Sequence, residues 1–144
     1  MKNIALIVLC LVFIRSAWAL TPPWSDSMLE QDSDLVVEGE IGEPILCLGL
    51  VDQNKCFDKK KFSVPLKVKK VIKGKGKKEE TLKLTFFYYD YSKSNCVGDQ
   101  AATVRSGERG IYYLKKLGDG SYQIVHWSGA KVLKEGTKGI PKCP

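Results

Sequence analysis

The stretch GIYYLKKLGDGSYQIVHW, residues 110–127, is the strongest local indication of the fold. Gly118, Asp119 and Gly120 are turn residues, and the segments 110–117 and 121–127 on either side are rich in β-branched and aromatic residues. Two such segments around a short loop containing glycine are typical of paired antiparallel strands. The stretch therefore predicts a β-hairpin.

Three earlier segments, 35–41, 62–73 and 81–89, alternate between apolar and polar residues with a period of two. This period is typical of strands that bury one face. The alternation changes phase at Lys70 and Val71, where we expect a bulge that bends the strand. The expected inward-facing positions are Leu35, Val37, Gly39, Ile41, Val64, Leu66, Val68, Leu82, Leu84, Phe86 and Tyr88.

A last short strand is expected at 130–133, and no segment of clear helical period is longer than about ten residues. Five or six short strands joined by turns predict an all-β fold. Strands of this number and length close most naturally as an OB-fold-like barrel, and a β-sandwich is the alternative. A short helix at one end of the barrel is expected from residues 26–31 or from 98–104.

The first residues, MKNIALIVLCLVFIRSAWA (1–19), predict a secretory signal peptide. A lysine near the start precedes an apolar run at 4–14, which is followed by the small-x-small pattern AWA. The run of about 11 residues is too short to span a membrane. Processing as a lipoprotein at Cys10 is less favoured, because Leu9 precedes that cysteine where a small residue is expected.

The exported chain is therefore predicted to begin at Leu20, with an arm over 20–33 and a single domain over 34–144. Of the 23 basic residues, two leave with the signal peptide, so 21 face 16 acidic residues and the net charge is about +5. No later apolar run is long enough for a membrane span. We expect a secreted or periplasmic protein.

Four cysteines remain after Cys10 is removed, and an even number in an exported chain predicts two disulfides. Three pairings are possible. We favour Cys47 with Cys56, because they bracket a short polar segment, and Cys96 with Cys143, which would fix the C-terminal tail. A zinc site is disfavoured because the chain has no C-x-x-C pair and the compartment is oxidising, so no metal is expected.

The basic stretch VIKGKGKK, residues 71–78, does not match the GxxxxGK[ST] pattern of a phosphate-binding loop. We favour a solvated turn between the strands at 62–73 and 81–89. The alternative is a basic patch that binds an anionic glycan or lipid head group, since export argues against nucleic acid. The lysines of this patch would be Lys67, Lys69, Lys73, Lys75, Lys77 and Lys78.

The aromatic stretch TFFYYDY, residues 85–91, would direct Phe87, Tyr89 and Tyr91 away from the core. Exposed aromatic rings on a barrel can stack on sugars. The alternative is that the arm covers them through Trp24, or that a tail does.

Catalytic motifs are weak in this sequence. The single histidine, His126, falls in a predicted strand beside Trp127, and no segment resembles a nucleophile elbow. The four remaining cysteines are expected to be oxidised, which argues against a Cys–His pair. The chain is therefore predicted not to be an enzyme and to need no cofactor. An enzyme built on two carboxylates is the least favoured option, and it would need a cleft with a perturbed acidic pair.

Five stretches in order, at 33–41, 65–75, 82–86, 94–99 and 106–133, resemble the OB-fold family of tissue inhibitors of metalloproteinases and netrin modules. The resemblance implies a secreted protein-binding module. Its partner would be an extracellular or periplasmic protein, such as a protease.

The inhibitors of that family place the amine and carbonyl of an N-terminal Cys-x-Cys on the protease zinc. This chain has no cysteine there, so the resemblance extends to the fold and not to that way of binding zinc. Cys96 matches the family's cysteine between strands, and its usual partner near the N-terminus is missing. The candidate contact surface is the start of the arm with the neighbouring barrel loops. The arm residues concerned are Leu20, Thr21, Pro22, Pro23 and Trp24.

Overall fold

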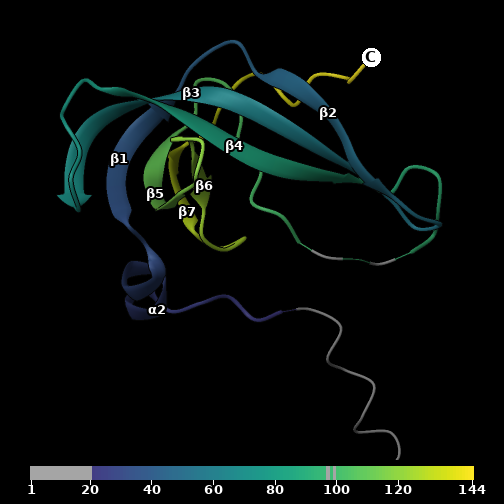
Figure 1. The fold of residues 1–144 in the computed structure, drawn as a ribbon, viewed down its shortest axis with the longest axis horizontal. Coiled ribbons are helices and arrows are strands. Elements are labelled where there is room, and N and C mark those ends of the chain that lie inside the picture. The colour runs from purple at the N-terminus through teal and green to yellow at the C-terminus, as the bar shows by residue number, and fades with distance from the viewer. Residues whose placement is uncertain (1–20, 97, 99) are drawn as a thin grey trace, which may run out of the picture.

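The structure is a computed structural model that describes residues 21–144 with the exception of 97 and 99. Within this part of the chain there are one short helix and seven strands (Figure 1). The elements are α2 (Asp26–Asp32), β1 (Leu35–Ile41), β2 (Leu46–Gln53), β3 (Asp58–Lys73), β4 (Thr81–Asp90), β5 (Arg109–Lys116), β6 (Tyr122–Ile124) and β7 (Ala130–Lys134).

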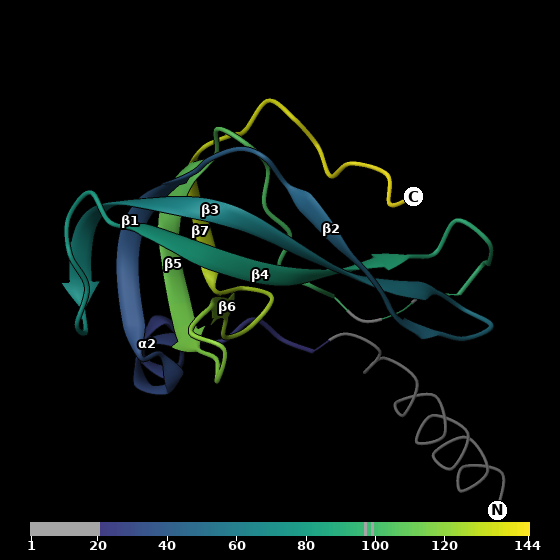
Figure 2. The same ribbon diagram turned by 45° about the horizontal axis from the view of Figure 1, so that its top comes forward.

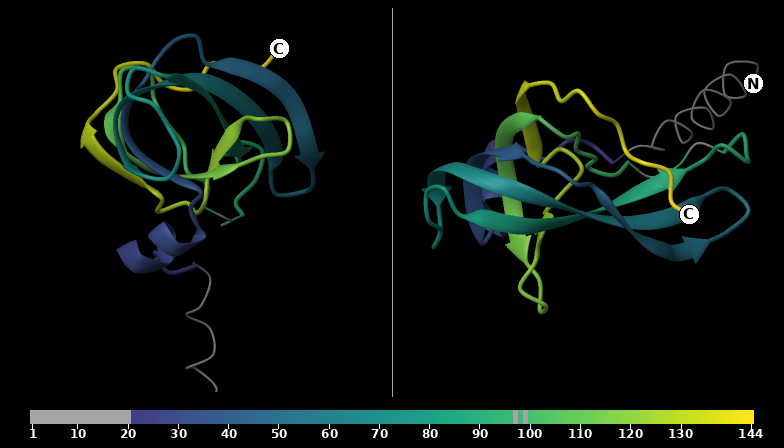
Figure 3. Two further views of the ribbon diagram at one scale, coloured as in Figure 1. Left: turned by 60° about the vertical axis from the view of Figure 1, so that its left-hand side comes forward. Right: turned by 90° about the horizontal axis from the view of Figure 1, so that it is seen from above.

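Five of the strands form a closed barrel in the order β1-β3-β4-β6-β5, and β1 pairs with β5 to complete the ring. The β4–β6 pair is parallel and the other four pairs are antiparallel. The left view of Figure 3 shows the strands curving round into this ring. The all-β, OB-fold-like barrel that the alternation predicts is confirmed, as are the hairpin around Gly118 to Gly120 and the short helix at 26–32.

The interior of the barrel is filled by the alternating apolar residues of these strands. Ten of the expected inward-facing positions are aliphatic or aromatic, and all of these except Tyr88 are buried. The exception has a physical cause: Tyr88 lies where β4 has left the barrel, and it is 36% exposed. The buried core cluster comprises Leu35, Val37, Ile41, Phe62, Val64, Leu66, Val68, Leu82, Leu84, Phe86, Val104, Tyr112, Leu114 and Ile124.

Helix α2 covers the outer face of β1 and β5. Ser25 caps the helix by accepting a hydrogen bond from the Met28 backbone, and Leu29 packs with Val36 and Tyr113 in a second buried cluster. Val36 points away from the barrel interior, and it is nevertheless buried because the helix lies over it. The arm is therefore packed against the barrel at this point.

Strand β3 is 16 residues long and extends well beyond the barrel. Along one edge its first half pairs with β2 and its second half with β1, while β4 runs along the other edge. We call the protruding part, which consists of β2, residues 58–61 of β3 and residues 87–90 of β4, the ribbon (Figures 1 and 2).

Three features of these strands differ from the sequence predictions. Strand β2 was not expected, and β3 begins at Asp58 and not at 62. Strand β6 ends at Ile124, so His126 lies in a bend and not in a strand. The predicted bulge is confirmed, because the β1–β3 register skips Lys69 and Ile72 on either side of the expected position.

Two disulfides are present, as predicted, but the favoured pairing was wrong. The bonds join Cys47 to Cys143 and Cys56 to Cys96, with Cα–Cα distances of 5.5 and 5.4 Å. Cys47 of β2 pairs with Phe62 of β3. Strand β2 then continues to Gln53 before the turn that contains Cys56. Six residues of strand span about 20 Å, which a disulfide cannot bridge.

The two disulfides indicate an oxidising compartment. The described residues contain no helix that is long and apolar enough to cross a membrane. The predicted signal peptide, residues 1–19, and Leu20 lie outside the described part of the chain.

Candidate functional site

Residues 21–24 of the arm lie on the turn that follows β6. The Trp24 backbone N–H donates to Ser128 Oγ at 3.1 Å, and Trp127 Nε1 donates to the Thr21 carbonyl oxygen at 3.2 Å. The ring of Trp24 stacks on His126 with a centroid separation of 4.5 Å and an interplanar angle of 11°. The start of the arm is therefore held in place without a covalent bond.

The turn itself is fixed to the barrel by backbone hydrogen bonds. The Gly129 N–H donates to the His126 carbonyl oxygen at 2.8 Å, and the Tyr113 N–H donates to the Gly129 carbonyl oxygen at 2.9 Å. The Val125 N–H donates to the Tyr113 carbonyl oxygen at 3.0 Å. Strand β5 thus positions the turn, and the turn positions Trp24.

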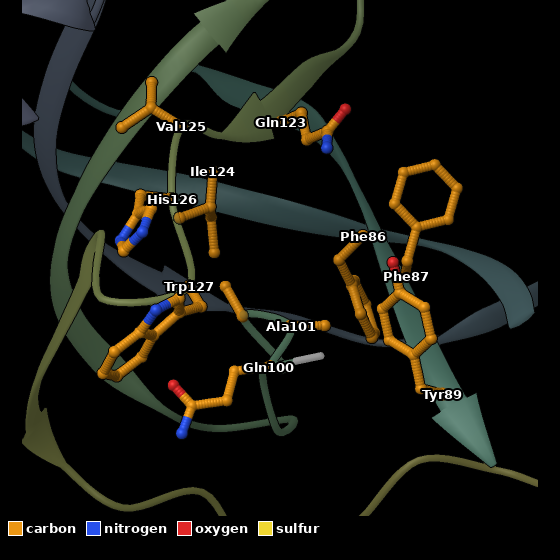
Figure 4. A pocket seen from close by; sticks show the side chains of 11 residues that line it. Phe86, Phe87, Tyr89, Gln100, Ala101, Gln123, Ile124, Val125, His126 and Trp127 are labelled. Carbon is orange, nitrogen blue, oxygen red and sulfur yellow. The ribbon is translucent and has the colours of Figure 1, made fainter. Parts of the chain in front are cut away.

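Next to this turn lies a hollow of about 190 Å³ that we call the aromatic groove. Figure 4 shows its side chains, which come from β4, from the segment around Gln100 and from β6 with the following turn. Phe87, Tyr89 and Trp127 supply aromatic surface, while Gln100 and Gln123 supply amide donors and acceptors. Aromatic surface with a few polar groups is the composition typical of the centre of a protein interface.

Phe87 and Tyr89 lie on the outward side of β4, as expected, and are only partly buried. The Lys59 ammonium lies 4.4 Å from the centroid of the Phe87 ring and 5.3 Å from that of Tyr89. The ring of Phe57 packs edge-on against Tyr89 at 5.0 Å. Lys59 and Phe57 therefore cover part of the Phe87 and Tyr89 rings. Trp24 stacks on His126 and not on these two rings.

His126 is the one histidine of the aromatic groove. Its Nδ1 is 2.8 Å from Ser128 Oγ, whereas its Nε2 is buried and has no hydrogen-bond partner among the described residues. Burial lowers the pKa of His126 below 6.5, because the charged imidazolium would lose its hydration there. The ring is therefore neutral at pH 7.

The lowered pKa of His126 predicts a loss of stability in acid. The unfolded chain takes up a proton near pH 6.5, whereas the folded chain does so only at lower pH, so acid favours unfolding. The contribution of neutral His126 to the free energy of unfolding should be fully present above pH 6.5. It should fall as the pH decreases from the pKa of the unfolded chain to the lower pKa of the folded chain, and then stay constant. Thermal unfolding of the wild type and of His126→Gln between about pH 8 and 5 would measure it.

The difference in melting temperature between the wild type and His126→Gln should shift in favour of the variant as the pH falls. A difference that stays constant with pH would contradict the prediction. It would mean that the face of the Trp24 ring stabilises the imidazolium as much as its burial destabilises it.

The basic stretch 71–78 ends β3 and forms the turn to β4, as favoured from the sequence. Two lysines of the candidate basic patch have contacts within the protein. Lys67 pairs with Glu79 at 2.9 Å, and Lys73 donates to the carbonyl oxygens of Glu30 and Ser33 at the end of α2. Glu79 raises the pKa of Lys67. Lys69 is half-buried, and three candidates are exposed at the turn, namely Lys75, Lys77 and Lys78.

The structure does not bring these lysines together with the outward aromatics. The turn lies at the Thr81 end of β4, and Phe87 and Tyr89 lie near its Asp90 end. Figures 1 and 2 show the turn and the ribbon at opposite ends of the molecule. The aromatics are instead brought close to the arm, through the aromatic groove.

One buried carboxyl group, that of Glu108, has a raised pKa. Glu108 is 3% exposed, burial raises its pKa, and it accepts a hydrogen bond from the Tyr112 hydroxyl at 2.9 Å. It does not line the aromatic groove, nor does it line either of two further hollows on the described surface, one next to Tyr88 and one next to Pro44. The described residues also contain no group of three His, Cys, Asp or Glu side chains that could hold a metal ion.

Sequence reasoning missed that the turn at 126–128 receives the arm. The Ser128-Gly129 pair indicated a break after Trp127, but nothing in the sequence indicated that β6 ends earlier, at Ile124. Gln100 and Gln123 carried no signal, since they reach the aromatic groove from distant parts of the sequence.

Fold and site together define a small β-barrel protein with two disulfides and an aromatic groove beside its docked arm. No protein-family model, curated protein or solved structure matches the chain.

Proposed function

We propose that this protein is a secreted protein-binding module that contacts its partner through residues 21–24 and the aromatic groove. The observation that carries the proposal is the docking of the arm on His126 and Trp127, two residues that line the aromatic groove together with Phe87 and Tyr89. Two disulfides support a site of action outside the reducing cytoplasm.

The docked arm suits such a role because it is ordered before any partner arrives. A segment that is already ordered loses little conformational freedom on binding, and this loss is a main cost of association. The stacking of Trp24 on His126 and the hydrogen bond from Trp127 to Thr21 supply that order without a covalent bond. Exposed tryptophan and tyrosine side chains are also the residues that most often dominate binding energy at interfaces.

A protease of the zinc-dependent class is the partner that we propose to test first. The arm is the predicted N-terminus of the exported chain, and the family that the sequence resembles binds these enzymes through its N-terminus. Binding through the lysine turn is less favoured, because Lys67 and Lys73 are engaged within the protein and the turn lies far from the aromatics along β4.

The test is to titrate the exported protein against a panel of zinc proteases, measuring both inhibition and direct binding. Trp127→Ala should weaken binding by about tenfold or more, because it removes an aromatic anchor together with the contact that orders Thr21. Tyr88→Ala is a matched control, since it removes an exposed aromatic ring from the opposite face of β4. Circular dichroism should show that both variants keep the fold.

Absence of inhibition at micromolar concentrations would remove the inhibitor version of the proposal. Absence of binding to every protease of the panel would remove this class of partner. An equal loss of affinity in both variants would remove the assigned surface.

A further inference from the structure

A second and larger hollow, of about 690 Å³, lies between the ribbon and the C-terminal tail. We call it the tail groove. One wall is the tail from Gly139 to Cys143, which the Cys47–Cys143 disulfide fastens to β2. The facing wall comes from β3 and β4 of the ribbon, and residues 103–105 complete it. The yellow tail in Figure 2 runs above the ribbon in this arrangement.

The base of the tail groove is apolar. Phe62 and Val104 belong to the buried core of the barrel, and Ile140 packs against that core from the tail. Tyr88 adds an exposed aromatic ring from the same face of the ribbon, since it pairs with Lys60 across β3 and β4. The ring that was expected in the core thus forms part of this surface.

The polar lining of the tail groove is predominantly positive. Lys60, Arg105 and Lys142 line it, against Asp90 as the one acidic side chain. Lys60 pairs with Asp90 at 3.0 Å, and hydrogen bonds from Ser92 are the largest cause that lowers the pKa of Asp90 to about 2. That pair is therefore charged and mutually neutralised at pH 7. Arg105 and Lys142 are exposed, and neither forms an ion pair with a described residue.

We propose that the tail groove binds an amphiphilic organic anion, with its apolar body against Tyr88, Ile140 and Pro141 and its head group at Arg105 and Lys142. The volume falls within the range of about 300–1,000 Å³ that small-molecule sites occupy. Arginine and lysine at the rim suit a carboxylate or a phosphate, and the apolar base suits a hydrocarbon chain. A polysaccharide chain fits less well, since it has no extended apolar part.

This site is separate from the proposed protein-binding surface. The two hollows share no lining residue. On β4 the tail groove is lined by Tyr88 and Asp90, whereas the partly exposed rings of the aromatic groove, Phe87 and Tyr89, lie on the other face of the strand. The buried Phe86 also lines the aromatic groove. Each site can therefore be tested without disturbing the other.

The experiment is isothermal titration of the disulfide-bonded protein with decanoate, decyl phosphate and the neutral decyl maltoside, each below its micelle concentration. We expect one or both anions to bind, with an affinity that falls as salt is added, and the neutral amphiphile to bind much more weakly. The comparison of decanoate with decyl phosphate separates a carboxylate ligand from a phosphate ligand.

The double variant Arg105→Gln/Lys142→Gln should weaken anion binding by about tenfold or more, because both partners of the head group are lost. The matched control Lys75→Gln/Lys78→Gln removes the same charge from the exposed turn at the other end of β4 and should leave binding unchanged. Hexanoate should bind more weakly than decanoate, because less hydrocarbon is buried. Trp127→Ala should retain binding of the anion even where it abolishes binding of a protein partner.

Three results would overturn the inference. The first is that neither anion binds up to its micelle concentration, and the second is that decyl maltoside binds as tightly as the anions. The third is that the control variant loses as much affinity as Arg105→Gln/Lys142→Gln, which would assign the effect to net charge and not to the tail groove.

Discussion

The variant Cys47→Ala/Cys143→Ala should unfold with a free energy lower than that of the wild type by about 4–5 kcal/mol. The bond joins residues that are 96 positions apart, so its loss releases almost the whole barrel sequence in the unfolded chain. Cross-links that close long loops restrict the unfolded state most, which is why this bond should contribute more than an average disulfide. Urea unfolding followed by tryptophan fluorescence would measure the loss.

The matched control is Cys56→Ala/Cys96→Ala, which removes a bond across 40 positions at the far end of the ribbon. Its cost should be smaller by less than about 1 kcal/mol, because loop entropy grows slowly with length. The two variants should differ more in ligand binding. Only the loss of the Cys47–Cys143 bond releases the tail and should abolish anion binding in the tail groove.

Peptide mapping of the wild type provides a direct check of the same prediction. A disulfide-linked peptide that contains Cys47 and Cys143 is expected. A peptide that links Cys47 to Cys56 would contradict both the pairing and the order of stabilities predicted from it.

The barrel could be predicted from the sequence because its strands are each buried on one face. Val64, Leu66 and Val68 alternate with polar or partly exposed neighbours, and this local pattern specifies which face meets the core. The hairpin at Gly118 to Gly120 is local in the same sense. A pattern that is complete within one segment can be recognised without knowledge of the rest of the chain.

Strand β2 could not be predicted in this way. It extends beyond the barrel, and its leucines at 46, 48 and 50 are about half exposed, so apolar residues do not mark a buried face there. Tyr88 was misplaced for the related reason that β4 continues past the end of the core. The alternation gives the side of the strand on which a residue lies, but not whether the barrel is still present at that point.

The two candidate surfaces were beyond prediction because each depends on contacts between distant segments. The Trp24 backbone contacts Ser128 across 104 positions. Lys142 and Lys60 line the same groove because the Cys47–Cys143 disulfide holds the tail there, and local spacing does not specify that pairing. The arm was a candidate surface from the sequence alone, but its place on the barrel depends on the turn at 126–128, whose residues His126 and Trp127 were expected in a strand.

The second large effect is expected where the barrel closes. Gly39 of β1 and Gly110 of β5 lie directly opposite each other in the pairing that completes the ring. A Cβ atom at Gly110 would lie 2.7 Å from the Lys131 carbonyl oxygen on β7, and one at Gly39 would lie 2.9 Å from the Lys67 carbonyl oxygen on β3. Four strands therefore approach one another closely at this point because both residues lack a side chain.

Gly110→Ala should lower the free energy of unfolding by about 2–3 kcal/mol, because the obstructing atom is backbone and the strands must separate to admit a methyl group. The matched control is Gly118→Ala in the hairpin turn, where an added Cβ would meet no atom within 4 Å. It adds the same methyl group and should change stability by no more than about 0.5 kcal/mol. Urea unfolding of the two variants side by side measures the difference.

The sign of the change in stability distinguishes a steric clash at Gly110 from the general preference of strands for alanine over glycine. Elsewhere in a strand, alanine in place of glycine stabilises by about 0.5–1 kcal/mol, because glycine loses more freedom on folding. If Gly110→Ala were as stable as the wild type or more stable, β5 and β7 would have to lie further apart than the structure places them. The packing of β7 against β5 would then not require a glycine at position 110.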